Sequence, residues 1–143
     1  LFGLILLLSF SKGFGQAVYQ LDATEKTHRL DSFMEIYIDS AGTATFQEVS
    51  SPGFQSRFSR SPSNALTFGY LRPPIWLKIN VQNLTSTNWF LEIPAPFLEG
   101  VDFYQQHGSF FQHIKTGYYL PHHTRGFPHT GYAFPPRFSE EGS

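Results

Sequence analysis

The sequence predicts an all-β domain, an antiparallel sandwich of two sheets, and three observations support this prediction. Aromatic residues make up 17% of the 143-residue chain, which favours pleated, half-buried surfaces. Short segments with a period of two recur between turn signals, as they do in sandwich domains. No helical period is visible after residue 17. A jelly roll is one sandwich of this kind.

The composition excludes several classes of protein. The formal net charge is −1, so no basic surface is available to bind nucleic acid. The chain has no Cys, which excludes disulfides, cysteine zinc sites and thiol nucleophiles. We therefore expect neither a nucleic-acid partner nor a cofactor.

Residues 1–17 are predicted to be a bacterial signal peptide whose first residues are trimmed. The apolar run is ten residues long, against the roughly twenty that a membrane-spanning helix needs: LFGLILLLSF. Gly15 and Ala17 are small residues two positions apart, as signal peptidase requires. The alternative is a buried apolar strand or helix at the start of the domain.

The first half of residues 18–143 predicts a loop with a short strand and then a hairpin. Residues 18–29 are polar and enter the domain. Residues 34–39 alternate apolar and polar side chains, residues 40–42 form a turn, and residues 44–49 are predicted to return as a strand. Residues 50–64 are rich in Ser and predict a long loop, in which Arg57 and Arg60 are expected to be solvated.

The second half predicts the clearest strands. In residues 75–83 the even positions and the odd positions point to opposite faces, and Pro73 and Pro74 set the start of the strand. Further strands are expected at residues 89–93, 101–104 and 110–114, with a hairpin turn at residues 106–109, and a short one at residues 132–134.

Several segments in one order resemble a known family. They are, along the chain: residues 66–69, Ile75-Trp76-Leu77-Lys78-Ile79-Asn80-Val81-Gln82-Asn83, Trp89-Phe90-Leu91-Glu92-Ile93-Pro94, Val101-Asp102-Phe103-Tyr104, and residues 117–125 with Pro121 between. This order is similar to the second type of extracellular domain on bacterial seven-transmembrane receptors with diverse intracellular signalling modules. The resemblance covers about residues 25–143, with Lys78 standing where Arg is more usual.

The resemblance implies a jelly-roll sandwich similar to carbohydrate-binding modules. It also implies a periplasmic sensor domain that precedes seven membrane helices and a cytoplasmic output. Because members of the family continue with further strands after the segment around Phe134, we expect the chain to be a fragment truncated before its last strands.

Candidate ligand-binding residues lie on one face of the predicted strand 75–83. Trp76 could provide an aromatic platform for a sugar, with Lys78 and Asn80 as hydrogen-bonding partners. The alternative is that this face packs under the second sheet or a loop, with Trp76 in the core and Lys78 paired with an acid such as Glu92. Arg125 could clamp a carboxylate or phosphate, or could fix its own loop.

The other candidate residues predict neither a metal site nor an enzyme active site. His122, His123 and His129 cluster in the sequence but fit no zinc spacing, so solvated histidines are expected instead of a metal site. No Gly-x-Ser-x-Gly motif is present, and the acidic pair at residues 140–141 lies in a polar tail. Asp102 and Tyr104 share one face of their strand, and a structural bridge is the ordinary explanation for such an Asp.

We therefore expect a non-enzymatic, exported sensor domain of a bacterial transmembrane receptor. It would bind a small ligand such as a carbohydrate, act at the periplasmic face of the inner membrane, and reach the membrane through the missing part of the receptor. The alternatives are a β-sandwich module for protein interaction or homodimerisation, and a carbohydrate-binding accessory module of a secreted enzyme.

Overall fold

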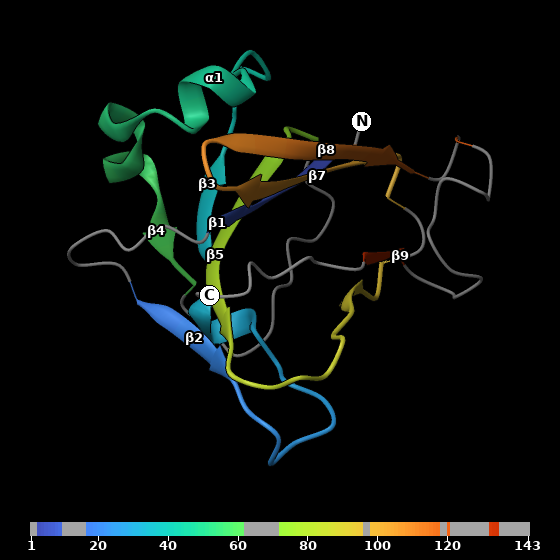
Figure 1. The fold of residues 1–143 in the computed structure, drawn as a ribbon. Helices are drawn as coiled ribbons and strands as arrows, with labels where there is room; N and C mark the ends of the chain where they lie inside the picture. The colour runs from blue at the N-terminus through green and yellow to red at the C-terminus, as the bar shows by residue number, and fades with distance from the viewer. Residues whose placement is uncertain are drawn as a thin grey trace.

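A computed structural model describes residues 3–9, 17–61, 72–95, 98–117, 120 and 132–134; for residues 3–9 and 132 it describes the backbone alone. The described chain forms short helices and mostly β-strands (Figure 1). The strands are β1 (Gly3–Ser9), β2 (Val18–Leu21), β3 (Glu35–Ile38), β4 (Ser59–Arg60), β5 (Ile75–Asn83), β6 (Leu91–Ile93), β7 (Gly100–His107), β8 (Phe110–Thr116) and β9 (Tyr132–Phe134). The helices are the 3-10 helix η1 (Asp31–Phe33), α1 (Phe46–Val49) and the 3-10 helix η2 (Pro52–Arg57).

The described strands form two sheets, as the sequence predicts. The larger sheet has the order β4-β3-β5-β1-β7-β8, with β2 also pairing with β5, and the smaller sheet pairs β6 with β9. The pairs β3–β4, β3–β5, β7–β8 and β6–β9 are antiparallel, whereas β1 runs parallel to β5 and β7, and β2 parallel to β5. The all-β, two-sheet prediction is confirmed, and the jelly-roll arrangement stays a prediction.

The main core lies on one face of β5 and β7. Alternation along β5 sends Leu77 and Ile79 to this face, and Val101 and Phe103 meet them from β7. Phe134 of β9 stacks on Phe103, with ring centroids 4.5 Å apart, so the smaller sheet contributes directly to this core. Burial of apolar side chains between the two sheets is the principal force that holds such a sandwich together.

The opposite face of β5 is covered by α1 and η2, which lie together above the larger sheet (Figure 1). Val49 and Phe58 pack against Trp76 and form a second apolar cluster. The prediction of a return strand at residues 44–49 is wrong, because Thr45 begins a helix there. The Thr45 hydroxyl accepts from the Glu48 N–H while the Glu48 carboxylate accepts from the Thr45 N–H, a capping box that sets the helix start.

The predicted loop at residues 50–64 is also more regular than expected. Its described part contains η2 and the short strand β4, and Arg57 lies over the Phe54 ring with 5.0 Å between the guanidinium carbon and the ring centroid. The turn before α1 is fixed by Asp39, whose buried carboxylate accepts from the N–H groups of Gly42 and Ala44. Side-chain hydrogen bonds, rather than apolar alternation, therefore shape residues 39–58.

The strands predicted in the second half of the chain are present. β5 matches the predicted range 75–83, and β7 and β8 form the predicted hairpin, although β7 continues through His107. The turn consists of Gly108 and Ser109, and Gly108 has a φ of 59°, which favours glycine. This two-residue turn fixes the register, so Tyr104 lies opposite His113 and Asp102 lies opposite Lys115.

Residues 3–9 form a strand between β5 and β7. This placement matches the alternative that we considered for the apolar run, and removal of residues 1–17 as a signal peptide stays a prediction. Among the described residues, no helix has the length and apolar character needed to cross a membrane.

Candidate functional site

The three predicted ligand-binding residues on β5 share one face, and the structure buries that face. Trp76, Lys78 and Asn80 are 2%, 2% and 3% exposed. The face is buried, as the second of our two interpretations proposes, but the cover consists of helices α1 and η2 and not of the second sheet or a loop. In this conformation a ligand at the outer surface would meet the covering segment first, so direct binding by these side chains stays a prediction.

Buried Lys78 lies at the centre of a polar group that includes partly exposed Glu35. Its ammonium nitrogen lies 2.8 Å from Glu35 Oε2 on β3 and donates to Gln55 Oε1 on η2 at 2.8 Å. The same nitrogen is 4.6 Å from the centroid of the Phe58 ring, which adds a cation–π contact. The acid that pairs with Lys78 is therefore Glu35, and the suggested Glu92 lies on β6 of the other sheet.

A column of stacked rings runs from this buried face to the surface. Trp76 stacks on Tyr104 of β7, with centroids 6.4 Å apart. Tyr104 stacks on Phe46 of α1 at 4.1 Å and on His113 of β8 at 4.2 Å, with interplanar angles of 9° and 7°. Phe111 meets Phe46 edge-on at 4.9 Å.

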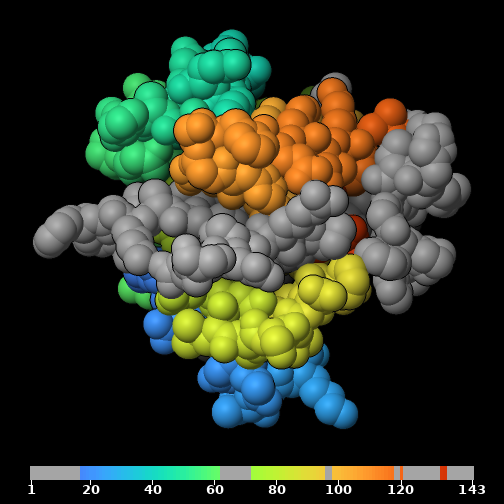
Figure 2. Space-filling view, viewed as in Figure 1, coloured from blue at the N-terminus to red at the C-terminus, as the bar shows by residue number. Residues whose placement is uncertain are grey.

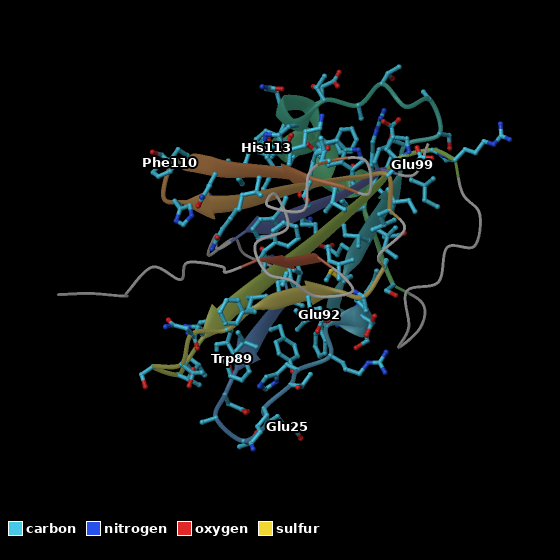
Figure 3. All side chains as sticks on the ribbon, turned by 90° about the vertical axis from the view of Figure 1, so that its right-hand side faces the viewer. Glu25, Trp89, Glu92, Glu99, Phe110 and His113 are labelled. Atoms are coloured by element: carbon cyan, nitrogen blue, oxygen red, sulfur yellow. The ribbon has the colours of Figure 1, made fainter. Side chains whose placement is uncertain are left out.

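The outer end of the column carries polar groups. The His113 Nε2 atom lies 2.7 Å from Asp102 Oδ1, and their side chains are 42% and 24% exposed. Exposed Lys115 lies directly opposite Asp102 in the hairpin. We call the exposed parts of Phe46, Asp102, Tyr104, Phe111, His113 and Lys115 the ring surface. Figure 3 shows His113 on the β8 side of the sheet, at the end of the molecule away from Glu25.

Burial raises the pKa of the Tyr104 phenol, and the neighbouring Asp102 carboxylate raises it further. The phenol therefore stays neutral at physiological pH and keeps a proton to donate. The ring surface thus combines flat aromatic area with a hydrogen-bond donor, a carboxylate, an imidazole and an ammonium group. It presents these groups where α1 meets the β7–β8 hairpin, and the two segments touch in the space-filling view (Figure 2).

Sequence reasoning found Asp102 and Tyr104 on one face but did not connect them with His113 or Phe46. The two-residue turn at Gly108 could have paired Tyr104 with His113, because hairpin length determines register. Nothing in the sequence pattern places Phe46 of α1 over Tyr104.

The remaining predicted sites fall partly outside the described residues. Arg125 and the histidines at positions 122, 123 and 129 lie outside them. Within the described ranges, no group of three or more His, Asp or Glu side chains is placed to hold a metal ion.

A second aromatic group shows that not every such cluster is a candidate site. The Tyr19 hydroxyl and His28 Nδ1 lie 2.8 Å apart, and the His28 ring meets Trp89 edge-on at 5.0 Å. The Trp89 indole N–H donates to Thr85 Oγ1 at 3.0 Å. The His28 side chain is only 7% exposed, so this cluster serves to hold the segment after β2 against the segment before β6.

Comparison with known proteins identifies the family. The family model described as 7TMR-DISM extracellular 2 matches residues 31–143, which is most of the chain. No curated protein and no solved structure matches the chain significantly. The match covers β5, the β7–β8 hairpin and every residue of the ring surface. The chain therefore belongs to the 7TMR-DISM extracellular 2 family, whose members are extracellular sensor domains of transmembrane receptors.

Proposed function

We propose that this domain binds a small ligand on the ring surface and that the ligand is a carbohydrate or a similar polar ring compound. The observation that carries the proposal is the column of rings that links buried Trp76 through Tyr104 to partly exposed His113. Stacked aromatic rings beside fixed polar groups suit a ligand with one apolar face and several hydroxyl groups.

Each group of the ring surface has a place in this binding mode. The aromatic faces and edges would contact C–H groups of the ligand, and Asp102 would accept hydrogen bonds from its hydroxyls. The Tyr104 phenol can donate, and Lys115 adds three further donors. Trp76 and Lys78 then act beneath the surface, since they hold the β5 face against which Tyr104 and η2 are packed.

The occupied state would reach the membrane through the rest of the receptor, with the domain at the periplasmic face of the inner membrane. The role that we propose is non-catalytic and needs no cofactor. Occupancy would tighten the contact between α1 and the β7–β8 hairpin, because the ligand would lie against both elements. A change in that contact is a physical signal that a receptor can transmit.

The test is thermal unfolding of the exported domain in the presence of sugars, organic acids and amino acids. A ligand that binds the folded state alone raises the unfolding temperature by mass action. We expect one sugar class to produce a shift, and we expect His113→Ala and Asp102→Asn to abolish the shift while each variant still unfolds cooperatively. Glu25→Ala, at the other end of the molecule, is the control and should keep the full shift.

If a ligand shifts all variants equally, it binds elsewhere and the ring surface is the wrong site. If no compound of any class shifts the wild-type domain, binding of a small ligand is contradicted.

A protein-interaction role is the second candidate, and β8 favours it. Among the described strands, β8 ends the order of the larger sheet, and Phe110 at its start is 65% exposed. An edge strand with an exposed aromatic residue can pair with a second copy of the domain. Light scattering of the wild type and of Phe110→Ser would distinguish the two roles. A dimer that forms through β8 would have a lower mass in the variant, whereas the mass of a monomer would not change.

A further inference from the structure

The column of rings leaves one face of His113 for a ligand. Phe46 and His113 both lie nearly parallel to Tyr104, with ring centroids 4.1 Å and 4.2 Å from its own. Two rings stacked this closely cannot share one face of Tyr104, so they occupy its opposite faces. A ligand ring can therefore extend the column on the outer face of His113, whose side chain is 42% exposed.

The two ends of this platform differ in polarity. Phe111 and Lys115 lie two residues before and after His113, so their side chains leave the same face of β8, each about 7 Å from His113 along the strand. Phe111 meets Phe46 edge-on, which makes the first end apolar. Asp102 bonds to His113 and lies opposite Lys115, so the second end carries both charged groups.

The polar end offers more donors than acceptors. Asp102 Oδ1 lies 2.7 Å from His113 Nε2, so one oxygen of the carboxylate is already engaged. The Lys115 ammonium forms no ion pair and no cation–π contact within the part of the chain that the structure describes. Its three N–H donors therefore stay available to a ligand.

This excess of donors distinguishes among polar ring compounds. A carboxylate on the ligand would accept charge-assisted hydrogen bonds from Lys115, which are roughly twice as strong as neutral ones. A hydroxyl group would leave most of the charge of Lys115 without a partner. An amino acid fits less well, because its ammonium group would meet Lys115 and an Asp102 that His113 already engages.

We propose that the ring surface selects sugars that carry a carboxylate, such as uronic acids. This inference rests on the proposed function of the ring surface and names its ligand class. The sugar ring lies on the outer face of His113, its C–H groups contact Phe111, and its carboxylate bonds to Lys115. The second oxygen of Asp102 accepts from a hydroxyl group of the sugar.

The charge of the whole chain does not favour an acidic ligand. The formal net charge is −1, so attraction of a carboxylate has to come from Lys115 itself. Lys115 is exposed, and its attraction should weaken with salt because the Debye length falls from about 10 Å at 0.1 M to about 3 Å at 1 M. Stacking on His113 has no such dependence. Salt therefore separates the two contributions.

The test compares methyl glycosides in matched pairs by isothermal titration calorimetry, with the complete receptor in a detergent that contains no sugar. The pairs are built on glucose, galactose and mannose, and each uronide differs from its neutral partner by a carboxylate in place of the CH₂OH group. In the series that binds, we expect the Kd of the uronide to be about tenfold lower at low salt, the effect of one hydrogen bond to a charged group. The ratio should fall towards one in about 1 M salt.

Substitution of Lys115 tests the residue that is assigned to the carboxylate. Lys115→Gln keeps a hydrogen-bonding side chain and removes the charge, so it should bring the ratio close to one and leave the Kd of the neutral glycoside unchanged. Lys115→Arg keeps the charge and should keep the preference. Lys26→Gln is the matched control, next in the chain to Glu25 at the other end of the molecule, and should leave the ratio unchanged.

Each other result has a distinct meaning. If the neutral glycosides bind as tightly as their uronides, the inference is wrong and the proposed function stands. If Lys115→Gln still prefers the uronide, another group reads the carboxylate and the assignment to Lys115 is wrong. If no glycoside of either kind binds, carbohydrate binding at the ring surface is contradicted, and this inference fails with it.

Discussion

Lys78 is a charged residue that is almost fully enclosed by the described part of the chain. Its ammonium group is held by Glu35, Gln55 and the face of Phe58. Loss of the ammonium group would leave the Gln55 side-chain oxygen unsatisfied and partly exposed Glu35 without its partner. The residue therefore fixes η2 on β5 and should be sensitive to truncation.

Lys78→Met keeps the aliphatic stem of the side chain and deletes the charge. We expect it to lower the free energy of unfolding by about 1–2 kcal/mol, because Gln55 and partly exposed Glu35 lose their common partner. Urea unfolding monitored by tryptophan fluorescence measures the change. Lys115→Met, on the exposed side of β8, is the control and should alter stability by less than about 0.5 kcal/mol. Equal effects of the two substitutions would contradict the role assigned to Lys78.

At this scale the sequence predicted which residues share a face and missed what they contact. Alternation correctly placed Trp76, Lys78 and Asn80 together. It could not identify Glu35 as the partner of Lys78, because that pairing depends on β3 being the neighbour of β5. Strand order is a property of the folded chain and has no signature in the local pattern.

At the scale of elements, α1 shows how a side chain can override an alternating pattern. Residues 44–49 alternate well enough to suggest a strand, yet the Thr45–Glu48 capping box makes them helical. Hydrogen bonds from Thr45, the backbone N–H first and the hydroxyl second, lower the pKa of Glu48 below its ordinary value of 4.5, with a smaller contribution from Arg57. The ionised carboxylate is therefore favoured in the folded state.

This cap predicts a pH dependence. Because the folded pKa of Glu48 is lowered, its contribution to stability is present above pH 4.5 and is lost as the pH falls through the folded pKa. We expect Glu48→Gln to reduce the urea midpoint at neutral pH and to have much less effect at about pH 3. Glu25→Gln serves as the exposed control. A Glu48→Gln effect that is the same at both pH values would show that the charge does not matter.

The start of β7 and the end of β8 approach closely at Gly117. A Cβ atom at this position would overlap the carbonyl group of Glu99 and approach the Gly100 Cα to 2.9 Å. We expect Gly117→Ala to lower the free energy of unfolding by about 2 kcal/mol, since backbone must move to accept the methyl group. Gly53→Ala, where nothing lies within 4 Å, should be nearly neutral. A neutral Gly117→Ala would mean that the two strand ends are not in contact in solution.

At the scale of the whole molecule, the packing of the two sheets against each other depends on a few large side chains. Phe134 comes from a strand of three residues, is 2% exposed and stacks on Phe103 of the larger sheet. Leu91 and Ile93 of β6 pack against the same core but are only partly buried, so Phe134 should matter more than the length of β9 suggests.

Phe134→Ala should lower the free energy of unfolding by about 3–5 kcal/mol, the usual cost of emptying a buried phenylalanine site. Thermal and urea unfolding both measure it. Phe110→Ala is the control, because this ring is 65% exposed and its loss should cost less than about 0.5 kcal/mol. If the two substitutions cost the same, β9 does not hold the sheets together.

At the scale of the whole molecule, the sequence predicted the fold class better than the order and direction of the strands. Composition and period-two segments gave the all-β class, two sheets and the strands around Leu77, Phe103 and Ile114. The parallel pairs of β1 and β2 with β5 were not expected, because alternation reports which face a residue takes and not the direction of the neighbouring strand. The ring surface was missed for the same reason, as it needs α1 beside the β7–β8 hairpin.

The pairing of β1 also has a kinetic consequence. Leu4 pairs with Ile75 and Gly3 with Gly100, whereas β7 and β8 are joined by a two-residue turn. Loop-closure entropy delays contacts between distant parts of a chain, so the β7–β8 hairpin should form early and the centre of the larger sheet should close last. In the partly folded chain, one side of β5 would therefore be paired with β3 before β1 pairs with the other side. The chain is most prone to aggregation while it is in this half-closed state.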